Sequence, residues 1–522
     1  MRSKVVDHVH KARFSDPDHR LRARRTDGSG SAVTRLHCRL AAKSCLRPAR
    51  AAVAARAAEH CAVGRRRRCH KGRRLMIAGA GIRTRSAAAA FAAAALAFCG
   101  IDQAYAQTDT APPPAQAATN TAATAASQPG FAIYGQATYT EQETNDFHAP
   151  YAGPNSLSPD MGRETSDATL FLGARLWRDA ELWVNPEVDE GAGLDDTLGL
   201  AGFSSGEAYK VGHYPPYFRL PRAFIRQTLN LGGAVSAGDA GPNQFALPQS
   251  SNRLVLTLGK VSVVDIFDTN RYAHDPRGDF LNWSVIDAGT FDYAADAWGY
   301  TVGGAAEWYV GSWAWRAGVF DLSNVPNSRN LEPGLDEYQV DLEAEHRHEL
   351  FGQPGKLDVT MFESRGRMAL YQDAIAYGEA NGLPPELAPV RRYRKRDGIS
   401  LNLEQQLTAN VGMFARLGDA GGNVETYEFT DIDYTASAGA SLSGGPWHRP
   451  GDTVGVARVV NAASRNLLEY LAAGGLGVLV GDGRLPHAGH ENILETYYQL
   501  AVVSAVQVTL DYQWVQNPGY NR

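Results

Sequence analysis

Cysteine is missing from most of this chain. All five cysteines lie within residues 38–99, and residues 107–522 contain none. Those 416 residues therefore have neither a disulfide framework nor a thiolate metal site. They also lack any apolar run of about 18 residues, which excludes a helical membrane protein.

Acidic residues are scarce in the first 106 residues and common afterwards. Residues 1–106 hold 23 of the 51 lysines and arginines but only six of the 56 acidic residues. The rest of the chain keeps 28 basic and 50 acidic residues, a net charge of −22, whereas the whole chain carries −5. Such an acidic excess repels anions at low ionic strength. It argues against an anion channel.

The segment 76–106 has the pattern of a signal peptide. Met76 is followed by Arg83 and Arg85, a short apolar run at residues 87–99, and the triplet Ala-Tyr-Ala that ends at residue 106. A basic start, a short apolar run and small residues at the cleavage site are typical of a secreted precursor. We therefore expect Met76 to be the true start and the leader to be cleaved.

Residues 1–75 fit no part of an exported protein. We predict that this basic segment is a spurious or disordered extension, included by a start codon chosen too far upstream. Its run of four arginines at 65–68 resembles a nucleic-acid-binding patch. Because the segment is expected to be a spurious or disordered extension, we predict no nucleic-acid partner. Residues 107–130 are rich in Ala, Thr, Pro and Gln, a composition that predicts a flexible tether.

From residue 131 onwards, apolar and polar residues alternate with a period of two. Leu170, Leu172 and Leu176 occupy one face of their segment, with Arg175 and Trp177 on the other. A strand sends successive side chains to opposite faces, so the pattern predicts β-structure. Fifteen strands are predicted, at residues 131–141, 168–177, 180–188, 219–230, 253–261, 297–309, 313–320, 337–347, 356–366, 397–406, 410–418, 432–443, 452–461, 490–502 and 505–515.

The connections distinguish a membrane barrel from a soluble β-sandwich, which would alternate in the same way. Those after even-numbered strands are mostly short, whereas those after odd-numbered strands are mostly long; the stretch 231–252 breaks the rule. Short turns at one end and long loops at the other are typical of outer-membrane barrels. Several tryptophans and tyrosines near strand ends fit the aromatic girdles of such barrels. We predict an all-β, transmembrane antiparallel barrel over 131–522.

Several longer segments resemble the carbohydrate-selective porins, the OprB-like family. The stretch 149–159 (APYAGPNSLSP) is similar to the first-loop motif of that family. Further similar segments are FLGARLW at 171–177, NPE at 185–187, DIFD at 265–268 through FLNW at 280–283, NLEQ at 402–405, and YLAAGGLG at 470–477. The resemblance covers roughly residues 131–519. It implies a 16-stranded barrel that passes small sugars through the Gram-negative outer membrane.

The carboxyl end departs from the family pattern. Only fifteen strands are counted, and bacterial barrels of this kind have an even number. Family members continue into a final strand with a terminal aromatic residue, whereas this chain ends NPGYNR at 517–522. We therefore expect a barrel whose last strand is missing, through a truncated record or a real defect. Two open edges in the membrane would leave unpaired backbone groups.

Alternation selects the side chains that face the pore. They lie opposite the lipid-facing leucines and carry charge, amide groups or aromatic rings. Arginines and carboxylates that face each other set up a transverse field suited to a neutral hydroxylated solute, and Trp183 would offer a stacking surface. The candidates are Arg175, Trp177, Trp183, Asn185, Glu187, Arg222, Phe224 and Arg226. The alternative is that these residues only solvate a wide lumen.

The long loop 262–296 is the second candidate region. In porins that resemble this chain, a loop folds inward and narrows the channel, and binding residues concentrate on loops held by rigid scaffolds. The charged candidates are Asp265, Asp268, Arg271, Asp275 and Arg277. A solvated external loop is the alternative.

No enzyme-like pattern has the right context. Residues 202–206 match G-x-S-x-G but lie within a loop, whereas the nucleophile elbow needs a strand before it and a helix after it. His487, His490 and Glu491 lie on a predicted external loop, where imidazoles more often bind nothing. We predict no catalytic residue, metal or cofactor.

The leading hypothesis is passive, carbohydrate-selective diffusion of small neutral sugars such as monosaccharides into the periplasm. A general or ion-selective porin is the alternative, because the fold does not fix the solute. An outer-membrane enzyme or a structural barrel is the third. The expected partners are sugars and outer-membrane lipid, and the sequence leaves open whether the barrel is a homo-oligomer.

Overall fold

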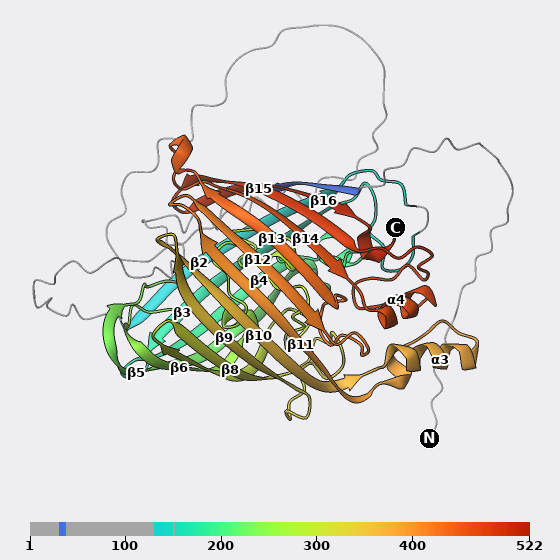
Figure 1. The fold of residues 1–522 in the computed structure, drawn as a ribbon, viewed down its shortest axis with the longest axis horizontal. Coiled ribbons are helices and arrows are strands. Elements are labelled where there is room, and N and C mark those ends of the chain that lie inside the picture. The colour runs from blue at the N-terminus through green and yellow to red at the C-terminus, as the bar shows by residue number, and fades with distance from the viewer. Residues whose placement is uncertain (1–30, 38–129, 150–151) are drawn as a thin grey trace, which may run out of the picture.

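The computed structural model describes residues 31–37, 130–149 and 152–522. From Phe131 onwards, fifteen consecutive strands each pair antiparallel with the next (Figure 1). All fifteen predicted strands are thereby confirmed. They are β2 (Phe131–Thr144), β3 (Gly162–Arg175), β4 (Ala180–Gly191), β5 (His213–Ala237), β6 (Pro248–Val261), β7 (Thr301–Val310), β8 (Trp313–Asp321), β9 (Tyr338–Leu350), β10 (Gln353–Met368), β11 (Arg392–Gln406), β12 (Val411–Ala420), β13 (Tyr434–Ser443), β14 (Thr453–Ala462), β15 (Glu491–Val503) and β16 (Val506–Gln516).

Strand β1 (Ser31–His37) closes the barrel between β16 and β2. It pairs with β16 along all seven of its residues, but with β2 only at Val33 and Thr34. The open seam expected from a missing last strand is thus occupied by a segment upstream of the predicted signal peptide. The rest of the predicted extension 1–75, the signal peptide 76–106 and nearly all of the tether 107–130 lie outside the described residues.

Successive side chains along the strands point alternately out of and into the barrel, as the sequence pattern predicts. On β3, Leu170 and Leu172 are 39% and 38% exposed on the outside, whereas Phe171 between them is buried. The outer surface of a membrane barrel faces lipid and is apolar, and its inner surface is polar. The inner faces of these strands accordingly carry buried polar side chains such as Thr169, Glu187 and Asn402.

Short and long connections alternate around the barrel. Long loops at one end cover 145–161, 192–212, 262–300, 322–337, 369–391, 421–433 and 463–490, and the connections at the other end cover 176–179, 238–247, 311–312, 351–352, 407–410, 444–452 and 504–505. The irregular stretch 231–252 is explained by its structure. Strands β5 and β6 extend into it as a long hairpin, which leaves a connection of only ten residues.

The helices lie in the connections. In the long loops are η1 (Leu194–Thr197), η2 (Val263–Asp265), α2 (Trp283–Ile286), α3 (Tyr371–Asn381), η3 (Ala388–Val390) and α4 (Arg465–Ala472); η4 (Gly445–Trp447) and η5 (Pro518–Tyr520) follow β13 and β16. Helices α3 and α4 project from one end of the barrel, at the right of Figure 1. Among the residues that the structure describes, no helix is long and apolar enough to cross a membrane.

An aromatic cluster fills the lumen beside β2 to β5. The indole of Trp183 lies 6.3 Å from the Tyr134 ring and 5.1 Å from the Phe245 ring, and its Nε1 donates to Glu181 at 3.0 Å. Phe245 belongs to the connection 238–247. This connection therefore folds against β4 and covers Trp183. Gly173 on the neighbouring strand makes room for the indole, because a Cβ at this position would lie 2.5 Å from the Trp183 ring.

We predict that Gly173→Ala destabilises the barrel by about 1–3 kcal/mol, because an added methyl group overpacks the contact with Trp183. Gly135→Ala is the matched control, since its Cβ would meet only atoms 3.7 Å away or more. Urea unfolding in detergent micelles measures both variants. Equal urea midpoints for the two variants would contradict the prediction, because they would show that the Trp183 indole moves aside without cost.

Candidate channel constriction

The loop 262–300 crosses the lumen and attaches to strands far from the two that it connects. The backbone N–H of Asp268 donates to Glu343 on β9 at 2.7 Å, and that of Arg271 donates to Glu404 on β11 at 2.6 Å. Further along, the N–H of Asn282 donates to Glu495 on β15 at 3.1 Å. The loop therefore spans the pore, as expected for a segment that narrows it.

Arg416 on β12 holds this loop in place. Its guanidinium is fully buried and donates to the carbonyl oxygens of Val285 at 2.9 Å and Ala273 at 2.9 Å. It also forms an ion pair with Asp268 at 3.3 Å. Asp268 has no exposed surface, so the structure makes it an anchor of the loop and corrects its expected place on the pore surface.

Arginines and carboxylates meet where β4 and β5 face the loop. Arg222 forms a bidentate pair with Asp265, with distances of 2.7 and 2.6 Å. Arg219 pairs with Glu187 at 2.6 Å and also with Asp189. The Tyr300 ring lies 5.5 Å from the Arg219 guanidinium and 5.0 Å from that of Arg222. These side chains form one charged site beside the loop. It is the candidate for the narrowest part of the channel, and we call it the constriction.

Sequence reasoning missed Arg219 because the strand is irregular at that point. Strict alternation from Arg222 would place Arg219 on the lipid side. The pairing of β4 with β5 shifts between Asn185 and Glu187, and this bulge turns both arginines inward. Pro221 between them was the available signal, because proline within a strand is typical of bulges and edges.

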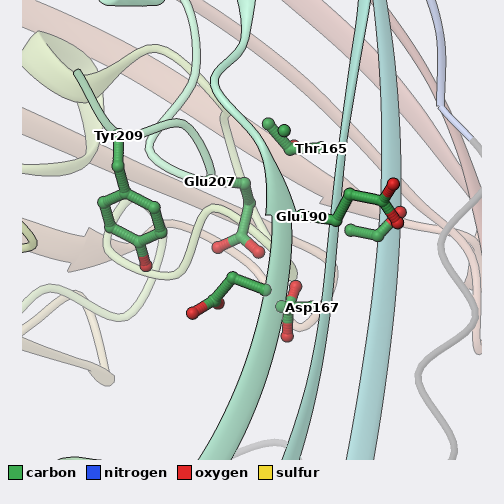
Figure 2. Close-up of a pocket in the computed structure, with 8 residues that line it drawn as sticks. Thr165, Asp167, Glu190, Glu207 and Tyr209 are labelled. Atoms are coloured by element: carbon green, nitrogen blue, oxygen red, sulfur yellow. The ribbon is translucent and has the colours of Figure 1, made fainter. Parts of the chain in front are cut away.

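Arg277, from the same loop, extends the constriction and pairs with two further acidic residues. Its guanidinium lies 3.2 Å from Asp167 on β3 and 3.1 Å from Glu207 in the loop 192–212. Burial raises the pKa of Glu207 well above its ordinary value, against the opposing charge of Arg277. Asp167 and Glu207 also line a small cavity with Thr165, Glu190 and Tyr209 (Figure 2), whose volume of about 10 Å³ is about the smallest that can hold one water molecule.

The cations at the constriction are more accessible than most of their partners. The side chains of Arg222 and Arg277 are 19% and 21% exposed, whereas those of Glu187 and Glu207 are 3% and 5% exposed. Asp265 is the accessible carboxylate, at 29%. The accessible part of the site therefore consists of guanidinium groups together with one carboxylate.

The other candidates lie elsewhere. Trp183, Asn185 and Phe224 are buried, so Trp183 has no free face for a sugar, and the expected stacking role is not supported. Trp177 is 60% exposed in the turn 176–179 and donates to Gln227, outside the lumen. Arg226 forms an ion pair with Glu181 at 3.2 Å, near the end of the barrel that carries the short connections. Arg175 is partly exposed on the inner face of β3, and Arg271 and Asp275 are solvent-accessible parts of the loop. Asp275 accepts the backbone N–H of Arg277 at 2.9 Å.

The residues of the enzyme-like patterns serve the packing of the loops. Glu491 is buried and accepts the backbone N–H groups of Ala201 and Gly202 at 3.0 and 2.8 Å.

Within residues 130–149 and 152–522, Glu343, Glu345 and Asp358 have carboxylates close enough to share a metal ion. The Arg316 guanidinium lies between the first two, at 2.5 and 2.7 Å, and already neutralises charge there.

The outer parts of three loops are joined by buried acids. Asp292 in the loop 262–300 accepts the N–H groups of Tyr427 and Glu428 at 2.7 and 2.9 Å. Glu428 in turn accepts the N–H of Ser323 at 3.2 Å. Burial raises the pKa of Glu428 well above its ordinary value, and the charge of Asp292 adds to the rise.

A closed antiparallel barrel with an inward loop and a charged constriction defines this chain as a porin, a channel and not an enzyme. The family model of the carbohydrate-selective porins, OprB family, matches residues 155–522. The chain belongs to this family, whose members are proteins of the Gram-negative outer membrane.

A solved porin structure shows the same fold. The high-pH structure of Pseudomonas putida OprB is similar with a TM-score of 0.53 and 14% identity, over 74% of this chain and 94% of that one. The channel DcaP of Acinetobacter baumannii has a TM-score of 0.37 and 9% identity, over 74% of this chain and 96% of that one. No curated protein matches the sequence significantly.

We predict that the melting temperature of the wild type falls, relative to that of Glu428→Gln, as the pH rises. A carboxyl whose pKa is raised in the folded state contributes stability at low pH, and this is lost as the pH rises through its folded-state pKa. The isosteric amide has no such ionisation. Thermal melts between acidic and alkaline pH measure the difference, and parallel curves for the two proteins would contradict the prediction.

Proposed function

We propose that this porin lets small neutral sugars, such as monosaccharides, diffuse passively into the periplasm. The observation that carries the proposal is the accessible Arg222–Asp265 pair at the constriction. A sugar hydroxyl both donates and accepts hydrogen bonds, so it can replace water at the guanidinium and at the carboxylate together. The name of the family supports the same class of solute.

An ion gains less from this constriction than a sugar does. A cation is attracted by Asp265 but meets Arg219, Arg222 and Arg277 within the same site, and an anion meets the carboxylates paired with them. Because charges of both signs are fixed close together, the field changes sign over a short distance. Dipolar hydroxyl groups fit such a field better than a single charge does.

Uptake into liposomes tests the solute class. We expect liposomes that contain the full-length protein to swell faster in glucose than in a larger sugar or in a charged solute of similar size. Liposomes without protein are the control. Equal rates for neutral and charged solutes of one size would indicate the general porin instead, and absence of swelling would refute a channel.

Arg222→Ala tests the constriction itself. The variant loses a charged hydrogen-bonding group and widens the pore, so single-channel conductance should rise. The preference for glucose over a charged solute should fall by up to about tenfold, as expected for loss of a hydrogen bond to a charged group. Arg178→Ala is the matched control, because its side chain is 95% exposed in a turn. Unchanged conductance in Arg222→Ala would remove this residue from the constriction.

A further inference from the structure

The outer surface of the barrel is hollowed across strands β6 to β10. The groove there has a volume of about 440 Å³. Ala306, Ala317 and Ala344 form its floor, and the larger side chains of Trp308, Trp315 and Leu342 stand around them. Arg316 and Glu343 also line it, but their charged ends pair with each other at 2.5 Å and lie buried. The groove is therefore apolar.

Strand register produces the groove. Ala306 lies opposite Ala317, and in the next row Trp308 lies opposite Trp315, which in turn faces Ala344. Small and bulky residues thus stand side by side on one surface. Trp308 and Trp315 remain 46% and 48% exposed, since no part of the described chain covers them.

The groove lies close to the short turns. Trp308 and Trp315 flank the turn 311–312, and short turns of outer-membrane barrels lie on the periplasmic side. Polar groups are found at this end of the same outer surface. The Trp308 Nε1 donates to Asn252 at 3.2 Å, and the His346 ring lies 4.5 Å from that of Trp313. Such amphipathic rings mark the level of the lipid headgroups.

We propose that the groove is a binding site for one phospholipid of the periplasmic leaflet, with an acyl chain along the alanine floor and the headgroup beside Asn252 and His346. The groove is continuous with the lipid-facing surface, so acyl chains are its immediate surroundings, and an unfilled hollow would forfeit dispersion contacts. A second copy of the chain fits less well. A two-fold interface brings the same patch of both subunits together, and two concave surfaces leave a gap between them.

Native mass spectrometry tests the site. The full-length protein is delipidated in detergent and titrated with dioleoyl phosphatidylethanolamine. We expect a single tightly bound lipid in the wild type and about tenfold weaker binding in the double variant Ala317→Leu/Ala344→Leu, because the leucines displace about two methylene groups of the acyl chain. Ala174→Leu on the lipid side of β3 is the control and should bind as the wild type does.

A second measurement locates the lipid independently of these variants. Phosphatidylethanolamine with a photoreactive acyl chain should label peptides of β7, β8 and β9 in the wild type more than those of other strands. Equal lipid affinity in the double variant and the control, or uniform labelling around the barrel, would overturn the proposal. A wild-type dimer that dissociates in the double variant would assign the groove to a second copy and would also overturn it.

Discussion

Backbone N–H groups of the loops inside the barrel need acceptors, and carboxylates on the inner faces of the strands supply them. Glu343, Glu404 and Glu495 accept from three points along the loop 262–300. Glu491 holds the loop 192–212 in the same way. A buried backbone group without a partner costs about as much as a lost hydrogen bond. Because each carboxylate receives such a group, long loops can fill a lumen that would otherwise be a wide aqueous pore.

Several buried arginines inside the barrel are paired with buried carboxylates. Arg416 pairs with Asp268 and Arg396 with Asp433, all without exposed surface. Removing one partner of such a pair costs several kcal/mol, because the other charge stays buried. The constriction uses the same pairing at sites that remain accessible, as at Arg222 and Asp265. Charges that fix the loop and the accessible charges of the constriction therefore follow the same principle of pairing.

The two surfaces of the wall have separate roles. The inner surface of strands β8 and β9 carries Arg316 with Glu343 and Glu345, whereas the outer surface of the same strands carries Trp315, Ala317 and Ala344. Since successive side chains point to opposite sides, a single stretch of sequence specifies both a polar lining and an apolar groove. Register across strands, and not the sequence of any one strand, brings the alanines together.

The sequence by itself determined the fifteen strands from Phe131 onwards, their antiparallel order and which side chains face lipid, because alternation and connection length are local patterns. It also proposed Arg222, Asp265 and Arg277 as candidates, and the structure places all three in ion pairs at or beside the constriction. Only the tertiary structure decided that Arg219 turns inward, since the bulge near Pro221 depends on pairing with β4. It likewise decided that Phe245 covers Trp183 and that Asp268 is an anchor. These contacts join residues far apart in the chain, and alternation fixes the direction of a side chain but not what covers it.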